Sequence, residues 1–113
     1  MFLESELIKR WENLILYIYP HLEKFPKTQR HRLVAKIERE HYCIYDLLVT
    51  ANTRWQKNNR TEILKEVDTK LKIYTFSLRI AHEMQFLKTK QWEVSVKMLS
   101  EIGRMLGAQI NKR

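Results

Sequence analysis

The feature that most constrains the fold of this chain is the spacing of its apolar residues. Along almost the whole sequence they recur three or four residues apart, which places them on one face of an α-helix. The alternation of apolar and polar residues that marks a half-buried strand is absent from the sequence. Only two glycines and two prolines occur among 113 residues, too few for the many turns of an all-β fold. The pattern therefore predicts an all-α protein.

Two helices are predicted in the first half of the chain. The first covers about residues 4–20. In Phe25-Pro26, the proline lacks an amide hydrogen and disfavours a helical conformation at the phenylalanine, so the pair marks a break. A second helix then begins at Thr28 or one residue earlier, with the Thr28 hydroxyl as the predicted N-cap.

Two more helices are predicted in the second half. Asn59 and Glu62 have the spacing of a capping box, which predicts that the third helix begins at Asn59. Thr89 is the predicted N-cap of the fourth helix. Because the connections are short, consecutive helices must be antiparallel. We therefore expect a single domain over residues 1–113, an antiparallel up-down four-helix bundle.

The predicted core consists of one row of residues on each helix. The rows are Leu7, Trp11, Leu14 and Ile18; Val34, Ile37, His41, Ile44, Leu48, Ala51 and Trp55; Leu64, Val67, Leu71, Tyr74, Leu78 and Ala81; and Trp92, Val96, Leu99, Gly103, Leu106 and Ile110. Gly103 has no side chain to bury, so we interpret it as a point where two helix backbones approach closely.

Residues capable of catalysis or metal binding do not form a complete motif. A di-metal bundle enzyme needs two Glu-x-x-His motifs, and only Glu38 with His41 fits. His82 begins a His-Glu-x-x-His zinc motif, but Phe86 stands in place of the second histidine. Cys43 is the single cysteine, and His41, two residues away, lies on a different helical face. We expect no catalysis, metal or cofactor, and we interpret His41 as a hydrogen-bonded core residue.

The compartment is also predicted from the cysteine count. One cysteine cannot form an intramolecular disulfide, which favours a reducing environment. The sequence has no apolar run of signal-peptide length and nothing near the roughly 20 apolar residues of a transmembrane helix. We expect a cytoplasmic protein.

The net charge points to a polyanionic partner. The formal charge is +8, from 21 Lys and Arg against 13 Asp and Glu, and nucleic acid is the commonest polyanion. On each of the last two predicted helices, three cations recur every seven residues and therefore stack in a basic column beside the core row. The predicted nucleic-acid contacts are Lys65, Lys72 and Arg79 in one column, Lys90, Lys97 and Arg104 in the other, and Arg30 and Arg32 near the start of the second helix. The alternative is a solvated face.

The other flank of the same two helices is apolar. The predicted interface residues are Ile73, Ile80 and Leu87 on the third helix and Met98 and Met105 on the fourth. Exposed apolar columns usually mark a contact with a partner, so we predict side-by-side self-association into a homo-oligomer. The alternative is a wide core stripe that absorbs these residues.

Three stretches resemble the accessory variability determinant (Avd) family of diversity-generating retroelements. They are residues 22–30 (LEKFPKTQR), 78–81 (LRIA) and 101–107 (EIGRMLG), within a similarity that covers about residues 11–107. The resemblance implies a four-helix bundle that assembles into a basic, barrel-like homopentamer. It also implies binding to an error-prone reverse transcriptase and its template RNA, in support of mutagenic cDNA synthesis, without catalysis by the accessory protein. The family's basic surface maps onto Lys72, Arg79 and Arg104 of this sequence.

Other functions remain open at this stage. Four-helix proteins encoded in ribosomal RNA intervening sequences share the fold and parts of the similarity. A di-metal bundle enzyme and a purely structural interaction module are the alternatives from other classes.

Overall fold

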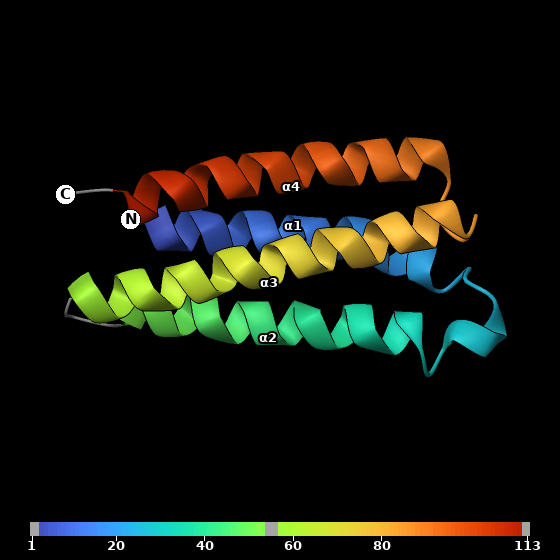
Figure 1. The fold of residues 1–113 in the computed structure, drawn as a ribbon, viewed down its shortest axis with the longest axis horizontal. Coiled ribbons are helices and arrows are strands. Elements are labelled where there is room, and N and C mark those ends of the chain that lie inside the picture. Colours follow the sequence, from blue (N-terminus) through green and yellow to red (C-terminus); the bar gives the residue numbers. More distant parts are fainter. Residues whose placement is uncertain (1–2, 54–56, 112–113) are drawn as a thin grey trace.

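The chain folds into four long α-helices that lie side by side (Figure 1). The computed structural model describes residues 3–53 and 57–111, and within those ranges it contains no β-strand. The helices are α1 (Leu3–Leu22), α2 (Leu33–Thr53), α3 (Lys57–Glu83) and α4 (Thr89–Ile110). Each helix runs antiparallel to the one before it. The predicted all-α fold of four helices is confirmed, and the packing is consistent with an up-down bundle.

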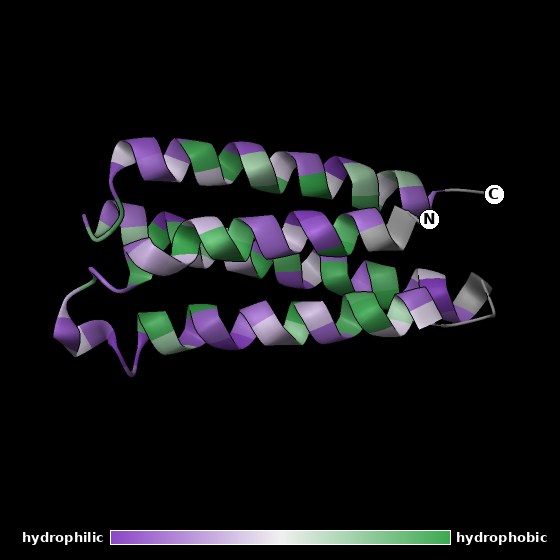
Figure 2. Cartoon of the chain, turned by 180° about the vertical axis from the view of Figure 1, so that it is seen from behind, coloured by the Kyte–Doolittle hydropathy of each residue, from purple (hydrophilic) through white to green (hydrophobic). Residues whose placement is uncertain are grey.

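The helices are arranged as a square in cross-section. α1 packs against α2 and α4, and α3 packs against the same two helices, so α1 and α3 lie on one diagonal. The molecule measures 44 × 24 × 21 Å. Hydrophobic and hydrophilic residues both recur along every helix (Figure 2), as expected for helices that bury one face and expose the other. No helix in the described ranges is apolar over enough of its length to cross a membrane.

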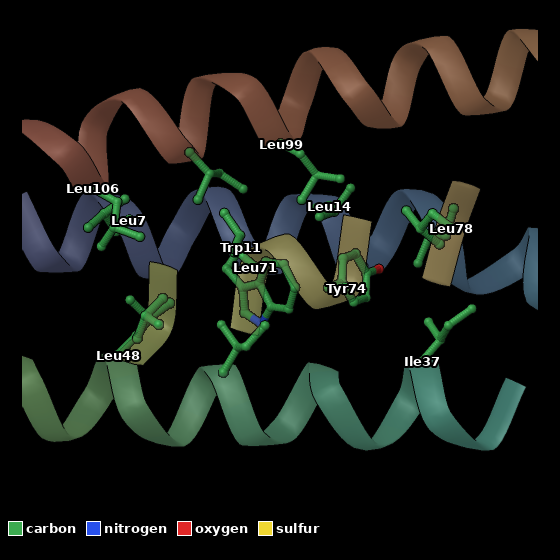
Figure 3. Close-up of a cluster of buried hydrophobic side chains, with 14 of the residues drawn as sticks. Leu7, Trp11, Leu14, Ile37, Leu48, Leu71, Tyr74, Leu78, Leu99 and Leu106 are labelled. Atoms are coloured by element: carbon green, nitrogen blue, oxygen red, sulfur yellow. The ribbon is translucent and has the colours of Figure 1, made fainter. Parts of the chain in front are cut away.

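The predicted rows on α1 and α3 form much of the core. Every residue of both rows is buried, and Trp11 and Tyr74 are the largest side chains among them (Figure 3). The α2 row is buried at Ile37, His41, Ile44, Leu48 and Ala51. Val34 is half-buried, and Trp55 lies outside the described residues. Burial of one large apolar side chain stabilises the fold by roughly 1.5–3 kcal/mol, so packing dominates over helix propensity.

The core-facing row of α4 differs from the predicted row. The buried residues are Ser95, Leu99, Ile102 and Leu106. Val96 and Gly103 are only half-buried. Both possible rows have helical spacing, and the polar Ser95 concealed the correct one. The Ser95 hydroxyl donates to the backbone carbonyl of Gln91 at 2.8 Å, so its burial leaves no unpaired donor.

The predicted close approach of backbones at Gly103 is wrong. A Cβ atom at this position would meet no atom of a neighbouring element within 4 Å. Gly103 lines a surface groove between α3 and α4 instead. The glycine faces open space because the core row of α4 is rotated away from it.

The start of α2 also differs from the prediction. The helix begins at Leu33, and Lys27–Gln29 forms a 3₁₀ turn, so Thr28 is not an N-cap. The turn is held by the Gln29 amide donating to the Pro26 carbonyl at 2.8 Å. The segment before α2 is rich in cations, and the first turn of α2 contains no acidic residue. Because cations are unfavourable at a helix N-terminus, an α-helix that starts after most of them avoids part of that cost.

The remaining two predicted caps are displaced as well. α3 begins at Lys57, so Asn59 lies inside the helix and the predicted capping box is wrong. α4 begins at Thr89, with Lys88 at the N-cap position, and the Lys88 amide donates to the Gln91 side-chain oxygen at 3.0 Å. The Thr89 hydroxyl lies 3.1 Å from His82 Nε2 instead. The side chain of Gln91, two residues after Thr89, therefore does the capping.

One polar cluster interrupts the apolar core. His41 and Tyr74 are both buried, and His41 Nε2 lies 2.8 Å from the Tyr74 hydroxyl. The Trp11 indole N–H donates to the His41 backbone carbonyl at 3.0 Å, and its ring meets Tyr74 edge-on with centroids 5.1 Å apart. The cluster fixes α1, α2 and α3 at one common level. It confirms the interpretation of His41 as a hydrogen-bonded core residue.

Candidate nucleic-acid interface

The eight predicted nucleic-acid contacts are all on the surface. The exposed cations are Lys65, Lys72 and Arg79 on α3, Lys90, Lys97 and Arg104 on α4, and Arg30 and Arg32 before α2. Seven residues of helix rise about 10.5 Å, so each three-residue column extends over about 21 Å. Because α3 packs directly against α4, the two columns lie on neighbouring helices.

A groove with an apolar floor lies between α3 and α4. Its lining residues are Asp68, Leu71, Lys72, Thr75, Val96, Leu99, Ser100 and Gly103. Of the two basic columns, only Lys72 lines the groove, so the groove meets the α3 column at its middle residue. A polyanion bound here would contact the Lys72 ammonium beside apolar atoms of the groove.

The cations of the two columns differ in their ion pairing. Lys72 pairs with Asp68 at 2.5 Å and Lys65 pairs with Glu62 at 3.5 Å, each within one turn of α3. Exposed pairs of this kind contribute only about 0.3–0.5 kcal/mol, so a phosphate can replace the carboxylate at little cost. Across the described ranges, Arg79 and the three α4 cations form no ion pair.

Arg30 and Arg32 lie at one end of the bundle, where two connections meet (Figure 1). One joins α1 to α2 and the other joins α3 to α4. Phe25 in the first connection packs against Phe86 in the second, with ring centroids 5.7 Å apart. The cations before α2 therefore share this end of the bundle with those of the second connection.

Two further cations at this end escaped the sequence prediction. Burial, and then the charges of Lys24 and Lys88, lowers the pKa of His21. These lysines come from different connections, so their joint effect on one imidazole shows that both lie near it. This proximity follows from the fold, because in an up-down bundle the first and third connections lie at the same end.

Comparison with known families identifies the chain. A family model described as bAvd-like matches residues 6–113, which extends over all four helices. The chain belongs to the bAvd-like family. The resemblance to Avd proteins is thereby confirmed, and the family is a non-catalytic accessory family. No curated protein matches the sequence.

In this bAvd-like chain, five of the seven positions of the 101–107 motif have a physical role in the structure. Glu101 accepts a hydrogen bond from Arg10 of α1 at 2.5 Å. Ile102 and Leu106 are buried in the core. Gly103 lines the groove, and Arg104 is exposed on the outer side of α4. The motif therefore combines packing against α1 with a surface cation.

The predicted apolar interface residues have mixed surroundings. Leu87 is 1 % exposed, so the prediction that it lies on an exposed column is wrong. It follows the end of α3 and packs into the core. Met98 and Met105 are half-buried against the core, which leaves part of each for a partner. Ile80 is half-buried, and Ile73 is 43 % exposed.

The candidate catalytic and metal-binding residues are not brought together. Burial lowers the pKa of His41 to about 4, and the Nε2 atom of its ring is hydrogen-bonded to the Tyr74 hydroxyl. Cys43 is half-buried. The described residues contain no group of three His, Cys, Asp or Glu side chains placed to hold a metal ion.

Proposed function

We propose that this bAvd-like protein is a non-enzymatic accessory protein of a diversity-generating retroelement. In this proposal it acts as a homo-oligomer, as the pentameric Avd resemblance implies. It binds the element's reverse transcriptase and template RNA and supports mutagenic cDNA synthesis. The observation that carries the proposal is the family match over residues 6–113. The charge of +8 and the exposed basic columns add a surface suited to RNA.

The proposed contact with RNA is electrostatic. Lysine and arginine side chains on α3 and α4 neutralise backbone phosphates and release condensed counterions. This contact is independent of base sequence, so recognition of the template RNA also depends on its shape and on the polymerase. The cations at the end of the bundle, namely Arg30, Arg32, Lys24 and Lys88, extend the same surface.

RNA binding is tested by a salt titration of affinity. The variant Lys72→Ala with Arg79→Ala should weaken binding to every RNA sequence alike. Its plot of log affinity against log salt should be shallower by roughly one to two units for each protomer engaged. Helicity by circular dichroism should not change, because both side chains are exposed and alanine favours helix.

A matched control separates local contact from general charge. Lys9→Ala with Arg39→Ala removes the same two charges from exposed positions on α1 and α2. This control should keep nearly the wild-type affinity and slope. If both double variants lose affinity equally, binding depends only on net charge and the assignment to α3 and α4 fails.

The accessory role is tested by reconstitution with the reverse transcriptase and template RNA of the same element. We expect mutagenic cDNA in the presence of this protein and little or none in its absence. A polymerase that gives the same cDNA yield and error rate without this protein would overturn the accessory role. The ribosomal intervening-sequence alternative predicts that outcome.

A further inference from the structure

A cavity of about 460 Å³ opens at the end of the bundle where α1 leads into α2. Residues 22–30, one of the stretches that resemble the Avd family, supply six of the residues that line it. Leu22 and Phe25 line the cavity although both are almost fully buried, so they form its floor. Pro26 and Val34 are more exposed and form an apolar wall. The volume lies within the roughly 300–1,000 Å³ typical of small-molecule sites, so the cavity can hold one ring-containing group.

Four charged side chains line the same cavity. Glu23 and Glu38 are acidic, and Lys27 and Arg30 are basic. Among the residues that the structure describes, none of these four forms an ion pair, although both signs of charge share one cavity. The carboxylate oxygens and the cationic nitrogens are therefore both available to a ligand.

The two acids differ in their surroundings. Glu38 follows Val34 by four residues on α2, so its carboxylate lies on the same helical face as the apolar wall. It is half-buried, whereas Glu23 is exposed after the end of α1. A hydrogen bond to a partly desolvated carboxylate is stronger than one made in water. Glu38 is therefore the principal acceptor of the cavity.

The chemistry of the cavity fits a guanine nucleotide. Its ligand must offer hydrogen-bond donors to a carboxylate, an apolar ring to the floor and negative charge to the two cations. Guanine carries N1–H and an amino group side by side, so both oxygens of one carboxylate can accept from it. In adenine and cytosine the amino group stands beside a ring nitrogen that is itself an acceptor. In uracil the single N–H stands between two carbonyl groups, so these three bases would set lone pairs against the carboxylate.

The charge of the protein favours a nucleotide over a protein segment with the same donors. A peptide that reaches Glu38 with an arginine or lysine side chain brings positive charge toward a chain that already carries +8. A nucleotide instead brings a phosphate, which Lys27 and Arg30 can bind. The planar guanidinium of an arginine can also stack on an unpaired base.

We propose that this cavity binds one unpaired guanine nucleotide. The base lies on the apolar floor, its Watson–Crick edge donates to Glu38, and its phosphate contacts Lys27 and Arg30. A guanosine within single-stranded RNA and a free guanine nucleotide present the same groups. The inference rests on the RNA binding proposed above, and it adds base recognition to the sequence-independent contact of the basic columns.

The test compares a short fluorescent oligouridine with the same oligomer carrying one central guanosine, by fluorescence anisotropy at fixed salt. Wild type should bind the guanosine oligomer about tenfold more tightly, within the discrimination that a bidentate base contact provides. An inosine oligomer lacks the amino group and should have an affinity between the two. Excess free GMP should remove the preference by competition, and excess UMP should not.

Two variants of equal charge assign the preference to the cavity. Glu38→Gln leaves one acceptor oxygen in place of the carboxylate, so the guanosine preference should be lost. Affinity for oligouridine should be kept or slightly increased, because a negative charge is removed. Glu12→Gln makes the same charge change at an exposed position on α1 outside the cavity, and it should keep the full preference. Circular dichroism checks that both variants are folded.

The outcomes separate this inference from the proposed function. If wild type binds both oligomers equally and GMP does not compete, the guanine site is wrong and the RNA contact of the basic columns stands. If Glu38→Gln keeps the preference, or Glu12→Gln loses it, the assignment to this cavity is wrong. If wild type binds no RNA at low salt, the proposed RNA binding fails, and calorimetric titration with GMP decides the site alone. Binding of GMP to wild type but not to Glu38→Gln then supports a site for the free nucleotide, and absence of binding overturns it.

Discussion

The buried pair of His41 and Tyr74 predicts that the fold loses stability in mild acid. His41 is neutral in the folded protein, since burial lowers its pKa from the ordinary 6.5 to about 4. In the unfolded chain the imidazole regains its ordinary pKa. As the pH falls below 6.5, the unfolded state therefore takes up a proton before the folded state does, and unfolding becomes more favourable.

The size of the effect follows from the two pKa values. One pKa unit corresponds to about 1.4 kcal/mol. With values of 6.5 and about 4, the free energy of unfolding should drop by about 2 kcal/mol between pH 8 and pH 5, and by about 3 kcal/mol at pH 4. Below pH 4 both states are protonated and this contribution becomes constant. Burial also raises the pKa of Tyr74, so its hydroxyl keeps its proton throughout this range.

The assay is urea unfolding followed by circular dichroism at a series of pH values. Carboxylates titrate in the same range, so the informative quantity is the difference between wild type and His41→Gln. Glutamine does not titrate, and its amide can still form a hydrogen bond with the Tyr74 hydroxyl. His31→Gln, at an exposed position, is the matched control and should follow wild type at every pH.

The reasoning would be refuted by parallel pH profiles. If wild type and His41→Gln lose the same free energy between pH 8 and pH 5, His41 does not titrate with the depressed pKa that its burial requires.

Three further predictions concern a helix glycine, a buried leucine and an ion pair. Gly103→Ala should raise the free energy of unfolding in urea by about 0.5–1 kcal/mol, because its Cβ meets open space and alanine favours helix. Leu14→Ala should lower it by about 2–5 kcal/mol because Leu14 is fully buried, whereas the exposed Leu16→Ala should change it by less than about 0.5 kcal/mol. A double-mutant cycle on Arg10 and Glu101 should give a coupling of about 0.2–1 kcal/mol, since solvent reaches both side chains.

The core could be predicted from the sequence wherever the apolar row has no competitor. On α1 and α3 one row alone has large apolar residues at helical spacing, and every member of it is buried. On α4 two adjacent rows share Leu99 and Leu106, and the choice depends on whether Ser95 or Val96 faces inward. A serine that satisfies its hydroxyl within its own helix can be buried, so hydropathy alone selects the wrong row.

Helix starts could not be predicted in the same way. Capping preferences describe which residue is best at a given boundary, but they do not fix where the boundary falls. Thr28 suits an N-cap, yet it lies inside the 3₁₀ turn Lys27–Gln29, and α2 begins only at Leu33. Asn59 suits a cap too, yet α3 begins before it.

The candidate site was partly accessible from the sequence. The heptad positions of Lys72, Arg79 and Arg104 predict exposed columns, and these residues are exposed. The meeting of Lys24 and Lys88 at one end of the bundle required the fold, because they are far apart in the chain.

RNA binding and self-association should respond to salt in opposite ways. Each chain carries a net charge of +8, so neighbouring copies repel one another, and added salt screens that repulsion within a Debye length of about 10 Å at 0.1 M. The apolar contact itself depends little on moderate salt, so the assembly should become stronger as salt rises. RNA affinity should fall over the same range, because each phosphate contact releases counterions.

Bound RNA replaces the screening that salt provides, and it should therefore favour assembly at low salt, where the free protein assembles least. Light scattering at low salt, with and without a short single-stranded RNA, measures this coupling directly. An assembly that weakens with salt in the absence of RNA would mean that ion pairs, rather than apolar contacts, hold the copies together.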